Sequence, residues 1–529
     1  MYNAFIMKKF LLILILTLCI CNSVSAKILF VPLDSRPACK NFAVDIGRIA
    51  GLELLVPPHE MLDYFTVAGE SKLLRKWLLD NAKDSDEIII SIDQILHGGL
   101  IAARESEIND TDIDELITFL KELKSNNPAI PIYAFSILPR MNPQSTIDNY
   151  YQRQALMQYS RLIGRMYAGQ QIDENVLYEL NTIIEPQNMR RYNLHFENNF
   201  KLNKRLIKLV DDKVIDRLIL GCDDAEPYSL QSVEVSKLKC SNQITHGADE
   251  IAMTLTAQIA VKDFKPKICV MYNNNRTAHL IMPYMASTIQ TVVNEKIRQI
   301  NGMIVDSPDL ADFTLFISVN DSKYMTRRSL QADSKRIAEL IARNKKVALV
   351  DLSMHFDKSE MLLPVLLAQK VNVNSLAAYS GWNTASNSIG TALAQAVTFC
   401  SSLKNMQTTE DVLQVYKNNL TFLNQRFVED YLYLKDTIDT VNHALTKSGS
   451  YDTSYLDLGT EYEFATFVLR SAMNKKINDY KQTTSFSNPI MIDSKHKIEL
   501  KDLSVETLRF PWNRTFEIEL KLSPTFIIS

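Results

Sequence analysis

Short apolar runs alternate with longer amphipathic segments between Lys27 and about residue 403. Runs of about 5–8 residues that are apolar almost throughout are typical of parallel strands buried on both faces. The segments between them carry apolar positions at helical spacing, as in residues 70–81, 112–124, 249–262 and 334–344. This repeated order predicts an α/β fold with a parallel sheet and right-handed crossovers. The nine predicted strands cover residues 28–33, 52–56, 87–92, 130–138, 217–222, 268–272, 313–319, 347–352 and 376–379.

Two arrangements of these strands remain open. The nine runs are one more than a (β/α)8-like barrel needs, so one arrangement is a barrel with an extra or spurious strand. The alternative is a pair of doubly wound half-domains, each with its own open sheet. Of the two we favour the barrel. It would form an α/β catalytic domain over residues 27–403, with residues 141–212 as a long, mostly helical insertion between the fourth and fifth strands.

The pattern changes after about residue 403. Residues 410–445 and 461–478 predict long helices, separated by a polar loop over 448–454. Short alternating runs, such as 516–522, indicate antiparallel strands within 485–529. We therefore expect a helical accessory region with a short β tail over residues 404–529.

The N-terminus has the features of an export signal. Lys8 and Lys9 precede an apolar stretch over residues 10–21, which is short for a membrane span, and Val24-Ser25-Ala26 follows. This pattern predicts a signal peptide over residues 1–26, cleaved after Ala26, with an uncleaved anchor as the alternative. No later run is long enough for a membrane helix. We therefore expect a secreted or periplasmic protein with no membrane span in the mature chain.

Composition narrows the class of partner. The chain has a formal net charge of -3 and no basic run, which argues against a nucleic-acid partner and favours a carbohydrate or another small molecule as substrate. The sequence lacks G-x-G-x-x-G, Walker A and G-x-S-x-G motifs, so we expect no cofactor and no serine-hydrolase chemistry. The mature chain would keep five widely spaced cysteines without C-x-x-C, each expected to be a buried free thiol.

Polar segments follow the predicted strands at their carboxyl ends. Ligands bind at this edge in parallel α/β folds, whichever way the sheet closes. The shared position of these segments predicts an active site there. The segments cover residues 32–37, 57–60, 93–99, 138–142, 223–228, 273–276, 320–321, 351–355 and 380–384.

Asp223 and Asp224 are the predicted catalytic pair. Two adjacent carboxyl groups, with Glu226 nearby, cannot all ionise cheaply in a confined cleft. One would then have a raised pKa and act as a general acid while its neighbour stays charged. The alternative is a solvated turn or a helix N-cap before Pro227.

Other residues are predicted to bind the substrate. Arg36 offers a guanidinium clamp, unless Asp34 and Arg36 only tie their own loop together. An exposed Trp382 beside Asn383 would suit a sugar ring, and a Trp buried under the last helix is the alternative. Asp249 and Glu250 stand at a helix start, where dipole stabilisation is a sufficient explanation.

Two D-x-x-x-H spacings suggest a possible metal site. Asp93 with His97 and Asp351 with His355 offer oxygen and nitrogen ligands. This spacing has no motif-level specificity, and a hydrogen-bonded histidine is the commoner case. We therefore predict no metal and assign Asp93 and His97 to substrate binding. The full predicted substrate-binding set is Asp34, Arg36, Asp93, His97, Asn275, Tyr379, Trp382 and Asn383.

The chain resembles a bacterial family catalogued as a domain of unknown function. The matching stretches are 32–37, the Asp223-Asp224 segment, 247–250 and 379–390, and the likeness covers roughly residues 27–500. A weaker resemblance is to (β/α)8 hexosaminidases with a paired acidic motif. It implies that Asp223 orients the acetamido group of the substrate and that Asp224 protonates the glycosidic oxygen. Asn275, Trp382 and Asn383 would then bind the sugar.

Three functions follow as hypotheses. The first is a secreted glycoside hydrolase that acts on amino-sugar-containing glycans. The second is a metal-dependent hydrolase of phosphate or amide bonds, built on Asp34, Asp93, His97 and Asp351. The third is a non-catalytic extracytoplasmic protein that binds a glycan or another solute. Stoichiometric zinc or manganese would favour the second over the first.

Overall fold

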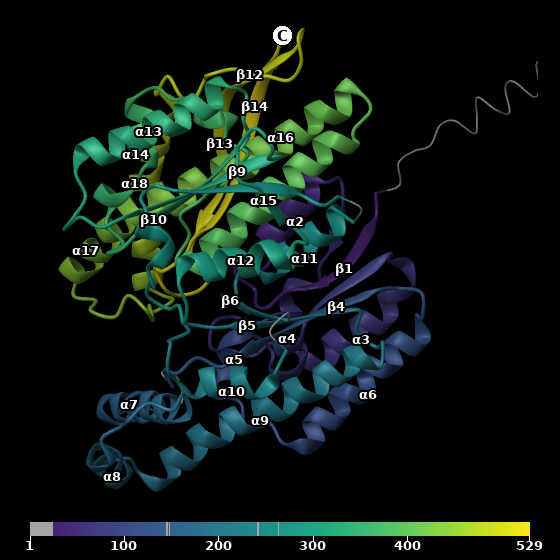
Figure 1. The fold of residues 1–529 in the computed structure, drawn as a ribbon, viewed down its shortest axis with the longest axis vertical. Coiled ribbons are helices and arrows are strands. Elements are labelled where there is room, and N and C mark those ends of the chain that lie inside the picture. Colours follow the sequence, from purple (N-terminus) through teal and green to yellow (C-terminus); the bar gives the residue numbers. More distant parts are fainter. Residues whose placement is uncertain (1–24, 144–146, 148, 241–242, 263) are drawn as a thin grey trace, which may run out of the picture.

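Two open parallel sheets form the body of the protein (Figure 1). The computed structural model describes residues 25–143, 147, 149–240, 243–262 and 264–529. The first sheet has the order β2-β1-β3-β4-β5-β6, and every neighbouring pair in it is parallel. Its strands are β1 (Lys27–Val31), β2 (Glu53–Leu55), β3 (Glu87–Ser91), β4 (Ile132–Leu138), β5 (Arg217–Cys222) and β6 (Ile244–His246).

The second sheet repeats this arrangement. Its order is β8-β7-β9-β10-β11, again with parallel neighbours, so the first strand of each sheet lies between the second and the third. The chain direction across the sheet reverses beside β1 and beside β7, and ligands bind at such switch points. The strands are β7 (Lys267–Tyr272), β8 (Met303–Ile304), β9 (Phe313–Asn320), β10 (Val347–Ser353) and β11 (Ala378–Ser380).

The half-domain alternative is therefore the correct one, and the barrel that we favoured is not formed. All nine predicted strands are present. The apolar pattern missed β6 and β8, which have three and two residues. It could not exclude a barrel because residues buried on both faces look alike in an open and a closed sheet. Within the described chain, no strand pairing joins the two sheets.

Helices fill the space between the sheets and cover their outer faces. The helices α2 (Asn41–Ile49), α11 (Ile251–Ala260), α12 (Ile289–Gln299) and α15 (Ala385–Asn405) lie between the two sheets in Figure 1 and share one apolar core with both. The outer face of the first sheet packs against α3 (Ser71–Asn81), α6 (Asp110–Asn126) and α9 (Pro186–Asp211). On the second sheet, α13 (Arg327–Ala342) and α14 (Leu363–Ala368) take the corresponding position.

The segment between β4 and β5 is helical, as the sequence predicts. It comprises α7 (Tyr150–Tyr167), α8 (Glu174–Ile183) and the long crossover helix α9. The pair α7 and α8 has a small apolar core of its own against α9 and stands at the lower end of the molecule in Figure 1. The insertion therefore projects from the first sheet.

The C-terminal region is mainly helical and packs on the second sheet. It contains α16 (Thr409–Arg426), a π-helical segment (Phe427–Thr437), α17 (Ile438–Ser448) and α18 (Glu461–Lys481). A three-stranded antiparallel sheet follows, formed by β12 (Ile490–Met491), β13 (Lys497–Arg509) and β14 (Glu519–Ile528). The long predicted helix over 410–445 is thus interrupted by a π-helical stretch of 11 residues.

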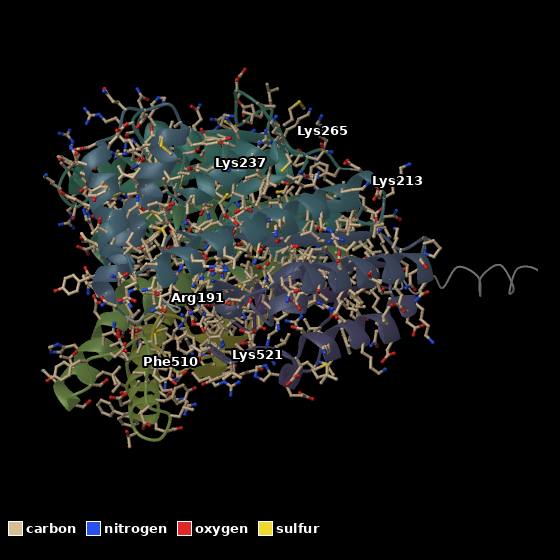
Figure 2. The ribbon with its side chains drawn as sticks, turned by 90° about the horizontal axis from the view of Figure 1, so that it is seen from below. Arg191, Lys213, Lys237, Lys265, Phe510 and Lys521 are labelled. Carbon is tan, nitrogen blue, oxygen red and sulfur yellow. The ribbon has the colours of Figure 1, made fainter. Side chains whose placement is uncertain are left out.

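The described residues also test the predictions about membrane spans and cysteines. They contain no helix with the length and apolar character needed to cross a membrane. The predicted signal peptide falls mainly on residues 1–24, outside the described residues. Cys39, Cys222, Cys269 and Cys400 are buried free thiols, whereas Cys240 is only partly buried. Exposed lysines such as Lys213, Lys237 and Lys265 stand apart from one another in Figure 2.

Candidate functional site

An open cleft of about 560 Å³ lies where the two sheets and the C-terminal region meet. The first sheet contributes the segments that follow β1, β3, β4, β5 and β6, and the second contributes Tyr284, Phe356 and the start of α15. The C-terminal region closes the remaining side through residues 453–454 and 514–516. Most of the wall therefore comes from the carboxyl ends of strands, as expected for a ligand site. The polar lining residues are Arg36, Arg104, Arg140, Asp223, Asp224, Asp249, Asn383, Thr384, Asn387, Asn442, Thr453, Ser454, Arg514 and Thr515.

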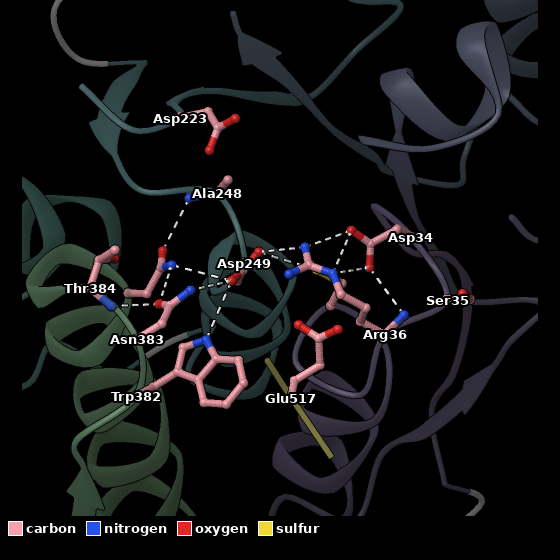
Figure 3. A network of polar contacts seen from close by, with 12 residues as sticks. Asp34, Ser35, Arg36, Asp223, Ala248, Asp249, Trp382, Asn383, Thr384 and Glu517 are labelled. Carbon is pink, nitrogen blue, oxygen red and sulfur yellow. Dashed lines mark hydrogen bonds and ion pairs between the residues drawn. The ribbon is translucent and has the colours of Figure 1, made fainter. Parts of the chain in front are cut away.

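Arg36 lies between two buried carboxylates (Figure 3). Its Nη2 atom lies 2.7 Å from Asp34 Oδ2 and 2.8 Å from Asp249 Oδ1, and all three residues are at most 5% exposed. Asp34 also accepts the backbone N–H of Arg36. Because Asp34 is fully buried and does not line the cleft, it orients Arg36 within the loop. Of the two sequence interpretations of this loop, the observed contacts fit the structural tie.

Contacts from Asp63 and from the C-terminal region fix the same loop. The Ser35 backbone N–H donates to Asp63 Oδ1 at 2.8 Å. Trp512 Nε1 donates to Ser35 Oγ at 2.9 Å, and the Arg36 guanidinium lies 5.2 Å from the centroid of the Trp512 ring. The loop after β1 is therefore rigid, because both the first sheet and the C-terminal region hold it.

Asp249 is an ionised carboxylate at the wall of the cleft. Burial favours its neutral form, but the Arg36 charge and a hydrogen bond from Trp382 hold the pKa of Asp249 below its usual range. Its Oδ2 atom accepts hydrogen bonds from Trp382 Nε1, Asn383 Nδ2 and Asn387 Nδ2, each at 3.3 Å. Sequence reasoning missed this role because a carboxylate at a helix start already has a structural explanation.

Trp382 and Tyr379 are core residues. Trp382 is 2% exposed and packs edge-on against Phe42, so the expectation of an exposed tryptophan platform is wrong. Tyr379 is fully buried and donates from its hydroxyl to Asp351 Oδ2 at 3.2 Å. Neither side chain lines the large cleft. The aromatic residues that do so are Tyr284, Phe356 and Phe516.

The predicted catalytic pair follows β5 and faces the cleft. Asp223 forms an ion pair with Arg104, and Asp224 Oδ2 lies 3.3 Å from Arg140 Nη1. Asp224 has a left-handed backbone with φ 37° and a side chain that is 31% exposed. Burial, and then the neighbouring Asp223, raise the pKa of Asp224 to about 6, against the lowering effect of both guanidiniums.

Glu226 does not join this pair. Its carboxylate forms two hydrogen bonds with Arg161, at 2.7 and 2.8 Å, on the insertion helix α7. It is absent from the lining of the cleft. The two adjacent aspartates are thus separated from the third acid, which anchors the insertion.

Asp93 and His97 line a second, smaller pocket of about 60 Å³ that shares Arg104, Arg140 and Asp223 with the cleft. Asp93 Oδ2 accepts the backbone N–H of Ile137 at 3.0 Å, and burial raises the pKa of Asp93 to about 7. His97 Nδ1 contacts Ser106 Oγ, and burial lowers the pKa of His97 to about 3. At neutral pH this pocket therefore presents an uncharged imidazole, and Asp223 also lines it.

The structure does not bring the remaining predicted residues to the cleft. Asn275 is exposed on the loop after β7 and does not line it. Asp351 belongs to the second sheet, where it accepts the backbone N–H groups of Leu362 and Leu363. It is thus separate from Asp34 at the end of β1, and the four residues of the metal-dependent hypothesis have different local partners.

Within the described residues, one group of three has metal-ligand spacing, namely Asp321, His355 and Glu360. Glu360 Oε1 is 2.8 Å from His355 Nδ1, and Glu360 Oε2 accepts the hydroxyl hydrogen of Ser353 at 2.6 Å. These contacts account for the cluster as a tie between the loops that follow β9 and β10.

Arg104, Arg140 and Asn387 complete the site, and sequence reasoning assigned none of them to it. Arg140 lies in a polar segment that we singled out, directly after β4. Asn387 lies within a stretch that carries the family resemblance. Arg104 had no signal, because it belongs to the short helix α5 (Leu100–Glu105) and meets Asp223 across 119 residues.

Comparison with known families agrees with the family resemblance seen in the sequence. The chain matches the family described as "Protein of unknown function (DUF4127)" over residues 28–521. It belongs to that family. Among curated proteins, none matches it. The match spans both parallel sheets and most of the C-terminal region, so the DUF4127 unit includes every wall of the cleft.

Proposed function

We propose that this DUF4127 protein is an extracytoplasmic glycoside hydrolase in which Asp224 is the general acid. The observation that carries the proposal is a partly exposed carboxyl group at the wall of a large cleft, with its pKa raised to about 6. An acid with this pKa is about half protonated near pH 6 and about one-tenth protonated at pH 7, and it can donate its proton to a leaving glycosidic oxygen. Most glycoside hydrolases use a carboxylic acid in this role, and substrate-assisted enzymes are exceptions to the usual carboxylate pair that flanks the scissile bond.

Asp223 is suited to orient an acetamido group. Arg104 engages only Asp223 Oδ2 through its Nε and Nη2 atoms. Within the described chain, Asp223 Oδ1 has no hydrogen bond, so it can accept the N–H of an N-acetyl substituent. This division of roles favours amino-sugar-containing glycans over simple neutral sugars, because an acetamido oxygen can then act as the nucleophile.

The remaining lining suits a ligand rich in hydroxyl groups. Each guanidinium that reaches the cleft faces a carboxylate, so the wall has little uncompensated charge. Amides and hydroxyls stand between these ion pairs, with aromatic carbon from Phe516 and Tyr284. A sugar ring has the same mixture of hydrogen-bonding edges and apolar faces. The ion pairs are Arg36 with Asp34 and Asp249, Arg104 with Asp223, Arg140 with Asp224, and Arg514 with Glu517.

The extracytoplasmic location rests on the N-terminal sequence. Lys8 and Lys9, the apolar stretch over 10–21 and the small residues at Val24 and Ala26 form the pattern of a cleaved signal. N-terminal sequencing of the exported protein should begin at Lys27. An intact N-terminus on a membrane-attached product would favour the uncleaved anchor.

A screen of aryl glycosides tests the activity. The substrates include N-acetylglucosaminides and N-acetylgalactosaminides, and the proteins are the wild type, Asp224→Asn and Glu226→Gln. We expect Asp224→Asn to lower kcat by about 10²–10⁴-fold, the usual contribution of general acid catalysis. Glu226→Gln is the matched control and should keep the rate, because Glu226 pairs with Arg161 outside the cleft. No turnover on any substrate, or an unaffected Asp224→Asn, refutes the proposal.

A non-catalytic binding protein is the second candidate. Two lobes with the same strand order and a cleft between them are a common site for solute binding. A binding protein should keep its affinity for N-acetylglucosamine in the Asp224→Asn variant and show no turnover in the wild type. Calorimetric titration together with the screen separates the two candidates.

A further inference from the structure

A small side pocket of about 20 Å³ adjoins the cleft on the side of the second sheet. The two spaces share Tyr284, Phe356, Asn383 and Thr384 as lining residues. The other walls of the pocket come from the carboxyl ends of β10 and β11, where ligands bind in such sheets. A space of about 10–15 Å³ is the minimum for one water molecule. Only a small substituent therefore fits here, while the body of a ligand would occupy the cleft.

Lys435 brings a positive charge into this pocket. It comes from the π-helical segment, is 4% exposed and lines the pocket, with Nζ 4.2 Å from the centroid of the Phe356 ring. Within the described chain, Nζ has no hydrogen bond, and no carboxylate oxygen lies within 4.0 Å of it. Burial lowers the pKa of Lys435 to about 8. A buried ammonium group without a close anionic partner is costly unless a ligand supplies one.

The acidic groups around Lys435 are engaged elsewhere. Asp430 forms an ion pair with Arg426 and accepts the N–H of Gly381 at 2.9 Å. Asp351 accepts two backbone N–H groups of the loop that follows β10. Glu360 contacts the imidazole of His355 through Oε1 and accepts the backbone N–H of His355 at Oε2. These carboxylates stabilise the lysine charge from a distance but leave its hydrogens free for another acceptor.

The N-terminus of α15 faces the same pocket. Thr384 and Ala385 line it, and α15 is 21 residues long with no acidic residue in its first turn. The Thr384 side chain does not cap the helix. In the described part of the chain, the N–H groups of Ala385, Ser386 and Asn387 have no acceptor. The first turn of a helix with free N–H groups attracts anions through these donors and the helix dipole.

We propose that this pocket is an anion subsite that binds a small acidic substituent, a carboxylate or a sulfate ester, of the ligand in the cleft. Lys435 and the first turn of α15 converge on it from the C-terminal region and the second sheet. The inference rests on the proposed function in one respect, that a sugar occupies the cleft. It adds the substrate class, since the cleft itself is charge-balanced and the uncompensated positive groups are in the side pocket.

Calorimetric titration with three probes tests the subsite. The probes are D-glucose, D-glucuronate and D-glucose 6-sulfate, which differ only at C6. We expect the wild type to bind at least one acidic probe about tenfold or more tighter than glucose, the scale of a charge-assisted hydrogen bond. Lys435→Met should abolish this preference. Lys346→Met is the control, because Lys346 is also packed on aromatic rings but donates to Tyr416 outside the pocket.

A second variant keeps the test independent of any folding defect in Lys435→Met. Thr384→Asp places a carboxylate at the N-cap of α15. Aspartate is a favoured N-cap residue, so the fold should persist. It should remove the acidic preference by occupying the subsite. Equal wild-type affinity for all three probes, or an unchanged preference in both variants, overturns the proposal. Inorganic sulfate that binds as tightly as the acidic sugars would show a free-anion site and also overturns it.

The result is separable from the proposed hydrolase activity. Binding is measured without turnover, and Asp224→Asn should keep the preference for the acidic probe. A protein that prefers the acidic sugar but hydrolyses no glycoside refutes the hydrolase and supports the subsite. A protein that hydrolyses glycosides but does not prefer the acidic sugar supports the hydrolase and refutes the subsite.

Discussion

Arg36 Nη2 and Asp249 Oδ1 are 2.8 Å apart and join loops that are 213 residues apart in the sequence. The pair ties the end of β1 to the start of α11, within the wall of the cleft. Because Asp34 engages the same guanidinium, one side chain forms ion pairs with two buried carboxylates.

Replacing Arg36 with Met should therefore destabilise the protein strongly. Removing one partner of a buried ion pair costs about 3–5 kcal/mol, because the other charge is left unpaired. Urea denaturation measures the change in the free energy of unfolding. The control is Arg205→Met, whose partner Asp114 is 64% exposed, and it should cost less than about 1 kcal/mol. Equal losses in both variants would contradict the structural role of Arg36.

The pH dependence of glycoside hydrolysis should follow Asp224. A general acid with a pKa of about 6 loses its proton as the pH rises through that value, so the rate should fall there. Arg140 lowers this pKa, and Arg140→Met should move the alkaline limb to higher pH. The measurement is kcat/KM against pH for the best aryl glycoside. A limb that stays in place or moves to lower pH would exclude Asp224 as the titrating group.

Asp93 should make the protein less stable as the pH rises. Burial raises its pKa to about 7 in the folded state, so the folded protein holds this proton more tightly than the unfolded chain between about pH 4 and 7. The free energy of unfolding should fall across this window relative to Asp93→Asn, which keeps an oxygen to accept the N–H of Ile137. Thermal unfolding from pH 4 to 8 tests this. The control Asp80→Asn, at an exposed position, should show the same pH dependence of stability as the wild type. If Asp93→Asn also shows the wild-type pH dependence, Asp93 is not the group that causes it.

Gly390 should not tolerate a side chain. A Cβ atom at this position would lie 2.2 Å from Cγ of Glu250, which is fully buried and paired with Lys296. Gly390→Ala should therefore cost about 1–3 kcal/mol through overpacking. At Gly459 the nearest atom to such a Cβ is at 3.4 Å, so Gly459→Ala should be close to neutral in the same denaturation experiment. A neutral Gly390→Ala would mean that Glu250 can move aside.

The apolar pattern identified the strands because buried parallel strands are apolar on both faces. It did not give their pairing, which depends on contacts between distant segments. The short strands β6 and β8 carry too few residues for a periodic signal. The repeated order of the two sheets likewise has no trace as a sequence repeat, because topology constrains crossovers and not side chains.

Part of the candidate site could also be predicted from the apolar pattern, because this pattern locates the ends of the strands. Asp223 and Asp224 could be found because they directly follow an apolar run. Trp382 was misjudged, because a polar neighbourhood in sequence does not show that Phe42 and Asp249 enclose the ring in space. Arg104 could not be found at all, since its place beside Asp223 is fixed by the packing of a short helix.

The hydrogen bond from Trp512 to Ser35 spans 477 residues and has a consequence for timing. During synthesis the loop after β1 emerges almost first, but the tryptophan that holds it emerges almost last. Arg36 can reach its final orientation only when the chain is nearly complete. A nascent or C-terminally truncated chain should therefore form its first sheet and still have an unfinished cleft.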